Sequence, residues 1–404
     1  MVIIYEPRHP RHSHNQHRNI RLQIMYFNYL DFLKALRLSL LQKPFRIRRW
    51  IYVLFFSALF LSFIILVALL RWLDSLFFPD FRKIEVHQPV FIIAPPRSGT
   101  SFLQKVLSQD EENFVHWKMY QTIFPSICFQ KLVNVLVWFD HKLGSIFSRF
   151  LNWCEVKWFG GWDELHTMRL NQPEEDGAIY LYAFANEAIY LLFPFVKELW
   201  NLGFQDDLPA EKRQKLMSYY RSCLQRQIYA NGNGRAMLIK STQSCGAIES
   251  LKKEFPDACF ITIIRHPFES IASNLSLTVP VWQAHSPEIT RDGPESRAYA
   301  GLVVEWYKHL FQFRSHVSLE NYFCIDYRDL RADPARTLEG LYDHFGWEMS
   351  EAFQASLNEI TIRQKTFKSK HLYTLEEFGL SRQWLQSELA SVLEAYGLAL
   401  NGDR

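Results

Sequence analysis

The stretch VFIIAPPRSGTSFLQKVL, from Val90 to Leu107, combines residue types that are suited to binding an anion. Its apolar start ends at two prolines, a turn follows at Ser98–Ser101, and the remainder has helical spacing of apolar residues. A glycine-containing turn between a strand and a helix directs backbone N–H groups toward a negatively charged group. The spacing therefore predicts a phosphate-binding loop, with an ordinary strand, turn and helix as the alternative.

The loop differs from the Walker loop of nucleoside triphosphatases at its charged position. Gly99 and Ser101 occupy Walker positions, but Thr100 stands where the lysine would be and Ala94 replaces the first glycine. Arg97 brings a positive charge earlier in the loop, and a guanidinium favours bidentate contacts with oxyanions. The pattern argues against a kinase or nucleotidase that uses ATP and magnesium, which we keep as a rival class.

A second basic residue follows another apolar run, in the stretch CFITIIRHPFESIASNLS. Arg265 comes directly after Cys259–Ile264, and Pro267 suits the first turn of a helix. Ser273 lies eight residues after Arg265, about two helical turns along. Because ligands of open α/β sheets bind at the carboxyl ends of strands, Arg265 and Ser273 are predicted to hold a second phosphate. A structural ion pair of Arg265 is the alternative.

The elements that must position these residues alternate between short apolar runs and helical stretches from about Pro89 onward. This alternation predicts an α/β fold with a parallel sheet flanked by helices. The expected strands are Val90–Ala94, Ala236–Ile239, Cys259–Ile264 and Tyr322–Ile325.

The composition narrows the class of partners. The formal net charge is only +3 over 404 residues, so the charge of the whole chain does not suggest a nucleic-acid partner. The six cysteines form no CxxC pair, so we expect no zinc ribbon and no thioredoxin-like site.

The residues before the sheet are predicted to form a tail, two helices and a linker. Residues 1–24 are His-rich and read as disordered, with Met25 as an alternative start, and residues 25–49 have amphipathic helical spacing. Within residues 50–72, the run Ile51–Leu70 is uncharged and long enough to cross a hydrocarbon core of about 30 Å. We expect a membrane-spanning or membrane-anchoring helix, then a linker over 73–88, with a buried core helix as the alternative.

The distribution of basic residues predicts a membrane topology, and the aromatic residues bear on whether the chain contacts lipid. More basic residues precede the apolar run than follow it, which favours a cytoplasmic N-terminus and a catalytic domain on the other side. The segment from Gln109 to Trp200 is dense in aromatic residues. Core packing is the favoured interpretation, and a lipophilic acceptor pocket or a face on the bilayer is the alternative.

Several separated motifs, in the right order, resemble the sulfotransferase family, in particular a membrane-associated and largely bacterial branch. They are PRSGTSF, LNQPEEDG, LIKSTQSCGAIESLKKEFPDACF, RHPFESIAS, DYRDLRADPARTLEGLYDHFG and HLYTLEEFGLS. The resemblance covers residues 89–404, which we take as the catalytic domain, and implies a P-loop-like sheet. It also implies 3′-phosphoadenosine-5′-phosphosulfate (PAPS) as co-substrate, and no metal.

The resemblance assigns roles to residues of both motifs. It places the 5′-phosphosulfate on the loop Arg97, Ser98, Gly99, Thr100, Ser101 and Phe102. It places the 3′-phosphate on Arg265 and Ser273, the adenosine near Tyr327, and the transferred group near Lys240 and Arg97. Sulfuryl transfer, like phosphoryl transfer, is catalysed mostly by positioning and electrostatic stabilisation.

The chain departs from the family pattern after Lys240. Thr242 stands where that branch usually has proline, and Ser244 stands where it has histidine. The general base is therefore sought in WDELHTMRLNQPEED, where His166 has a suitable ordinary pKa and Glu174 and Glu175 are the rivals.

The expected function is a membrane-attached sulfotransferase that acts on a hydroxyl of a lipid or other amphipathic acceptor. Carbohydrate or protein-tyrosine sulfation is the alternative, as is a non-catalytic nucleotide-binding membrane protein. The attachment is single-pass or monotopic. The sulfate donor is supplied in the cytosol of bacteria and in the lumen of the Golgi in eukaryotes. The catalytic domain would therefore lie on the cytoplasmic face of a bacterial membrane or in the Golgi lumen of a eukaryote.

Overall fold

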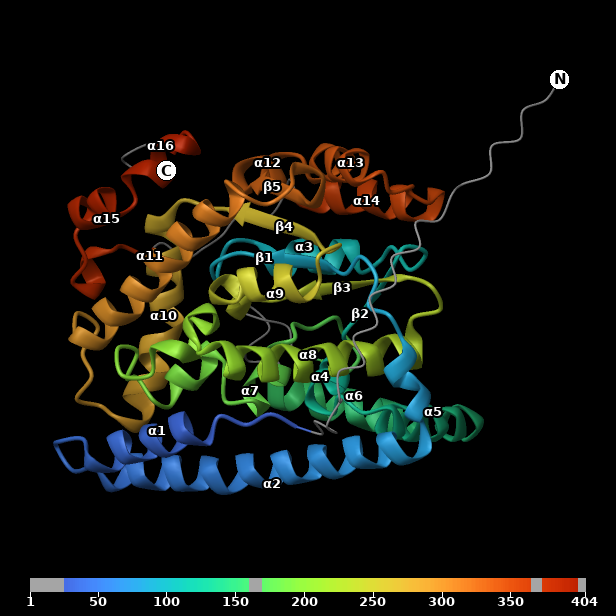
Figure 1. The fold of residues 1–404 in the computed structure, drawn as a ribbon, viewed down its shortest axis with the longest axis horizontal. Coiled ribbons are helices and arrows are strands. Elements are labelled where there is room, and N and C mark those ends of the chain that lie inside the picture. Colours follow the sequence, from blue (N-terminus) through green and yellow to red (C-terminus); the bar gives the residue numbers. More distant parts are fainter. Residues whose placement is uncertain (1–24, 160–168, 365–372, 399–404) are drawn as a thin grey trace.

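A five-stranded parallel sheet forms the centre of the molecule (Figure 1). The computed structural model describes residues 25–159, 169–364 and 373–398. All described pairings are parallel, and the strand order is β2-β3-β1-β4-β5. The strands are β1 (Val90–Ile93), β2 (Phe114–His116), β3 (Ala236–Lys240), β4 (Cys259–Ile264) and β5 (Tyr322–Asp326). The predicted α/β fold with a parallel sheet flanked by helices is confirmed.

The four predicted strands all form, with bounds within one residue of those expected. The edge strand β2 was not predicted, because three residues are too few to show either an apolar run or an alternating pattern. It pairs with β3 through Phe114 opposite Ala236.

Helices cover both faces of the sheet. Phe91 and Ile93 of β1 join one buried cluster with α7–α11, whereas Val90 and Ile92 join another with α3, α13 and α14, as the alternation of a strand requires. The α-helices of this part are α3 (Thr100–Leu107), α4 (Met119–Ile123), α5 (Ile127–Lys142), α6 (Ile146–Phe159), α7 (Gly177–Tyr182), α8 (Ala210–Asn231), α9 (Ile248–Glu254), α10 (Pro267–His285), α11 (Pro294–Arg314), α12 (Tyr327–Ala332), α13 (Pro334–Phe345), α14 (Glu351–Gln364), α15 (Arg382–Glu388) and α16 (Ala390–Ala395). The 3-10 helices are η1 (Pro79–Lys83), η3 (Glu187–Leu191), η4 (Trp200–Leu202), η5 (Gln205–Asp207), η6 (Thr242–Gly246), η7 (Leu319–Asn321) and η8 (Glu376–Phe378).

Two helices precede the sheet, α1 (Tyr29–Leu41) and α2 (Ile47–Phe77). The helix predicted over 25–49 thus ends at Leu41, and α2 extends beyond 50–72 at both ends. The interval 73–88, predicted as a linker, begins with the last turn of α2 and continues into η1. Residues 1–24 lie outside the described part of the chain. In Figure 1, α2 runs alongside the rest of the molecule rather than away from it.

A buried ionic cluster explains why α2 continues to Phe77. Asp74 accepts hydrogen bonds from the backbone N–H groups of Ile127 and Cys128, at 3.0 and 2.8 Å, and from Ser126 Oγ at 2.8 Å. It also pairs with Arg226 Nε of α8 at 2.9 Å. Asp74 therefore satisfies the free N–H groups at the start of α5 from a distant part of the chain.

Asp74→Ala is expected to lower the free energy of unfolding by about 3–5 kcal/mol, because it leaves Arg226 buried without its carboxylate. Chemical denaturation of the purified chain measures the change. Asp80→Ala is the matched control, since Asp80 pairs with Lys83 at the surface and its loss should change the free energy of unfolding far less. Equal losses in the two variants would contradict this prediction.

Candidate active site

The loop between β1 and α3 makes the sharp turn that the sequence predicts. Arg97 and Gly99 both have left-handed backbone, with φ of 69° and 92°. A Cβ atom at Gly99 would lie 3.1 Å from the ring of Tyr327, so only glycine fits there without displacement. α3 begins at Thr100, directly after the turn, and its first N–H groups have no partner within the helix. The loop therefore presents the positive end of a helix to a ligand.

Two arginines meet beside this loop. Arg97 Nε donates to Ser273 Oγ at 3.2 Å, and Arg265 Nη1 donates to the carbonyl of Arg97 at 2.6 Å. Arg265 also pairs with Glu269 at 2.9 Å and lies over the ring of Tyr327, 4.6 Å from its centre. Burial and the charge of Arg265 lower the pKa of Arg97. An anion between the two guanidinium groups would relieve this repulsion. The fold thus brings together Arg97, Arg265, Ser273 and Tyr327 from three separate segments.

Lys240, the last residue of β3, links the loop to the acidic segment. Its Nζ donates to Ser101 Oγ at 2.8 Å and lies 3.3 Å from Oε2 of Glu175. Thr242 Oγ1 donates to the same carboxylate oxygen at 3.1 Å. The residue that replaces the family's proline therefore orients Glu175, and Lys240 is buried between the loop and this carboxylate.

The three candidates for the general base are placed differently. Glu175 contacts Lys240, as described above. The carboxylate of Glu174 accepts a hydrogen bond from the N–H of Glu175 at 3.0 Å, and its backbone N–H donates to the carbonyl of Trp117 at 2.9 Å. His166 lies outside the described residues. The geometry favours Glu175 over Glu174 as the carboxylate nearest the cation.

Asp176 is a buried residue of the site that the sequence analysis missed. It accepts hydrogen bonds from Tyr220 Oη at 2.5 Å, from Ser241 Oγ at 3.1 Å, and from the amide of Gln243. Its own N–H donates to the carbonyl of Lys240 at 3.3 Å. Burial raises the pKa of Asp176 to about 7. Asp176 thus ties the acidic segment to the end of β3, and its place beside Glu175 in the sequence was the signal for it.

Glu187 is a second buried carboxyl group near the site. Its Oε2 is buried without a hydrogen-bond partner, and burial, followed by the charge of Glu175, raises the pKa of Glu187 to about 8. The group is therefore largely neutral at neutral pH. It lies in the aromatic-rich segment, where the sequence offered no signal except an isolated acid among apolar residues.

The other residues of the loop differ in how deeply they are buried. Ser98 and Thr100 are buried, and Ser101 is exposed apart from its contact with Lys240. Phe102 is half-buried against the cluster of apolar residues that includes Val90 and Ile92. Phe102 thus anchors α3 to the sheet, so its predicted contact with the ligand stays a prediction.

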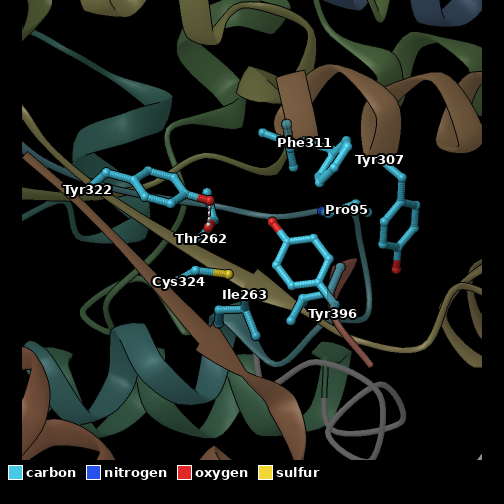
Figure 2. A pocket seen from close by; sticks show the side chains of 10 residues that line it. Pro95, Thr262, Ile263, Tyr307, Phe311, Tyr322, Cys324 and Tyr396 are labelled. Carbon is cyan, nitrogen blue, oxygen red and sulfur yellow. Dashed lines mark hydrogen bonds between the residues drawn. The ribbon is translucent and has the colours of Figure 1, made fainter. Parts of the chain in front are cut away.

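A small pocket lies beside the loop, against the second half of β4 and the first three residues of β5 (Figure 2). Pro95, Tyr307, Cys324 and Tyr396 line it, and Thr262 and Tyr322 share a hydrogen bond of 2.7 Å across it. Its empty volume is about 270 Å³ with open solvent included, below the usual size of a ligand cavity. We assign no ligand to it.

The α/β protein has a helix N-terminus and three cations at the carboxyl edge of its parallel sheet, an arrangement suited to binding a polyanionic ligand. Residues 89–351 match the profile of the sulfotransferase family. Because this match covers more than half of the chain, the protein belongs to the sulfotransferase family and is a sulfotransferase.

Named relatives and solved structures agree with this assignment. The chain is 22% identical over 314 residues to an omega-hydroxy-beta-dihydromenaquinone-9 sulfotransferase, Stf3, of Mycobacterium bovis and of Mycobacterium tuberculosis, covering 76% of this chain and 75% of the relative. Sulfotransferase STF9 from Mycobacterium avium superposes with a TM-score of 0.67 at 16% identity, covering 94% of this chain and 99% of that one. Sulfotransferase STF1 from Mycobacterium tuberculosis H37Rv superposes with a TM-score of 0.63 at 19% identity, covering 90% of this chain and 92% of that one. These structures support the fold.

Proposed function

We propose that this sulfotransferase moves a sulfuryl group from PAPS to a hydroxyl of a lipid or other amphipathic acceptor at a membrane. The observation that carries the proposal is the position of Lys240 between Ser101 of the loop and Glu175. This contact puts a buried cation between the predicted donor site and a carboxylate that can accept a proton.

The residues of the site fit the donor. PAPS carries a 5′-phosphosulfate and a 3′-phosphate, and the structure offers two neighbouring groups of anion-binding residues. Arg97 and the start of α3 would hold the first, and Arg265 with Ser273 would hold the second. Tyr327, packed against Gly99 and beneath Arg265, would then lie beside the adenosine.

The reaction moves SO₃ in line between two oxygens. Glu175 takes the proton of the acceptor hydroxyl as the new bond from that oxygen to sulfur forms. The bond from sulfur to the bridging oxygen of the donor breaks, and the electron pair stays on the phosphate. Lys240 and Arg97 stabilise the charge that develops there, so the proposal requires no metal.

An acceptor with lipid character is supported by two observations. The relatives named above act, by their names, on omega-hydroxy-beta-dihydromenaquinone-9. In addition, α2 is long and apolar enough to cross a membrane by length and composition. In a bacterium the donor PAPS is supplied in the cytosol, so the catalytic domain would lie on the cytoplasmic face of the membrane.

A non-catalytic nucleotide-binding role is the second candidate, because Thr242 and Ser244 depart from the family pattern. Binding of adenosine 3′,5′-bisphosphate without transfer to any lipid, carbohydrate or tyrosine acceptor would favour it. Comparison of lipid sulfation in cells with and without the gene would separate these acceptor classes.

Arg97→Ala and Arg265→Ala are each expected to weaken binding of adenosine 3′,5′-bisphosphate about tenfold to a hundredfold, because each removes a charge-assisted contact of about 1.5–3 kcal/mol. Isothermal titration calorimetry measures the affinity. Arg336→Ala, at an exposed arginine of α13, is the matched control. Unchanged affinity in both site variants, or preferential binding of ATP with magnesium, would overturn the proposed donor.

A further inference from the structure

The large exposed apolar side chains gather on one connected set of helices. In residues 25–159, 169–364 and 373–398, all of them except Leu319 lie between residues 29 and 156. They belong mainly to α1, α2, α5 and α6; α2 contacts α1 and α5, and α5 contacts α6. We call the exposed apolar side chains between residues 29 and 156 the apolar face. So much exposed apolar surface marks a site of interaction with a membrane or a protein.

Both ends of α2 are bound to the same catalytic domain. Near its start, buried Arg49 donates to Ser286 Oγ at 3.1 Å and pairs with Glu288. Near its end, Asp74 pairs with Arg226. Asp74 lies 25 positions after Arg49, which corresponds to about 38 Å of helix, and a hydrocarbon core is about 30 Å thick. If α2 crossed a bilayer, its ends would lie on opposite sides and one of these networks would break.

The middle of α2 also packs on the domain. Val53, Phe60 and Val67 are buried along one side of the helix. The ring of Phe60 lies 6.3 Å from that of Phe32 in α1 and 6.1 Å from that of Phe184, which follows α7. One side of α2 therefore faces protein throughout, and the opposite side belongs to the apolar face.

We propose that α1, α2, α5 and α6 lie in the plane of one leaflet of an anionic phospholipid bilayer, with the apolar face inserted among the lipid chains. On this proposal α2 does not cross the membrane. The inference deepens the membrane attachment contained in the proposed function and rests on it.

Cations on these helices favour lipid over a second copy of the chain. Lys142 Nζ lies 5.7 Å from the ring of Trp138, and Lys157 Nζ lies 4.8 Å from the ring of Trp153. Such pairs of lysine and tryptophan suit the boundary between hydrocarbon and headgroups. Exposed basic residues also cluster around the start of α2, namely Arg37, Lys43, Arg46 and Arg48. This charge complements anionic headgroups and would repel the same face of another copy.

The buried sides of α1 and α2, which carry the apolar face on their outer sides, are connected to the candidate catalytic residues by one short helix. Glu175 and Asp176 lie just before α7, and Phe184 lies just after it, against Phe32 and Phe60. The six residues of α7 span about 9 Å. An in-plane arrangement thus keeps the candidate base close to the leaflet that would supply an amphipathic acceptor.

The side of the membrane on which each end of α2 lies tests the proposal. Lys43→Cys and Lys83→Cys, made singly in the full-length chain, place exposed thiols before and after α2. A membrane-impermeant maleimide is applied to sealed right-side-out and inside-out vesicles, and the unsubstituted protein gives the background of its six cysteines. We expect the thiols of Lys43→Cys and Lys83→Cys to be labelled in the same one of the two vesicle orientations. Neither thiol should be labelled in the other orientation. Labelling in opposite orientations would show that α2 spans and would overturn the proposal.

The contribution of α5 and α6 is tested by vesicle binding. The triple variant Leu136→Glu, Phe147→Glu and Trp153→Glu places charges in the apolar face, and Leu319→Glu places one exposed charge outside it. Sedimentation with vesicles of phosphatidylglycerol and phosphatidylethanolamine should fall at least about tenfold for the triple variant and stay unchanged for the control. An unchanged circular dichroism spectrum and an unchanged midpoint of chemical denaturation show that each variant is folded.

Undiminished sedimentation of the triple variant would overturn the proposal for α5 and α6. A discrete dimer of the unsubstituted protein, abolished by the triple variant without loss of vesicle binding, would assign the face to a second copy instead. Neither experiment needs a donor or an acceptor, so failure here is distinguishable from failure of the proposed reaction.

Discussion

Lys240→Ala is expected to lower kcat about 10²–10³-fold, because it removes a buried cation where negative charge develops as the sulfuryl group leaves. The affinity for adenosine 3′,5′-bisphosphate should change much less, since Arg97, Arg265 and the start of α3 still hold the two phosphates. The loss should therefore fall on the chemical step, because Lys240 stabilises the transition state more than the ground state. Single-turnover transfer of labelled sulfate measures it, with calorimetry on the same preparation.

Lys252→Ala is the matched control, because Lys252 lies on α9 and donates only to the carbonyl of His316 among its described hydrogen bonds. It should leave both quantities unchanged. If Lys240→Ala weakened nucleotide binding as much as it lowered the overall rate, with kcat intact, Lys240 would serve binding alone.

Glu175→Gln is expected to lower kcat about 10²–10⁴-fold, the usual loss when a general base is removed. Glutamine keeps the size of the side chain and an oxygen that can accept the hydrogen bond from Thr242. The loss should therefore reflect the missing proton acceptor rather than a collapsed site. Steady-state kinetics with a hydroxyl acceptor, at constant saturating PAPS, measure it.

Glu174→Gln and His166→Ala are the comparisons that decide the assignment. Glu174 accepts a hydrogen bond from the N–H of Glu175, which glutamine can also accept, so Glu174→Gln should stay near the unsubstituted rate. If Glu175→Gln is active and His166→Ala is not, the base is His166. If all three variants keep the full rate, the acceptor side of the site lies elsewhere.

The strands and the loop could be predicted because their signals are local. Each of β1, β3, β4 and β5 is a short run of mostly apolar, β-branched or aromatic residues, and β1 and β4 are buried along their whole length. The turn at Gly99 follows from its residue types, since left-handed backbone favours glycine. The positions of Arg97 and Arg265 at strand ends then follow from the parallel topology, which brings all carboxyl ends to one edge.

The sequence by itself determined four of the five described strands, the glycine turn after β1 and the family, because these depend on neighbouring residues in the chain. The tertiary structure decided which carboxylate meets Lys240, because the contact joins β3 to a segment more than sixty residues away. It also decided that Asp176 is buried beneath the site and that α2 lies along the domain. Hydropathy describes α2 as a span, but the partners of Arg49 and Asp74 lie far along the chain, in Glu288 and Arg226. Only folding brings such distant charges together, so the composition of α2 alone could not place it along the domain.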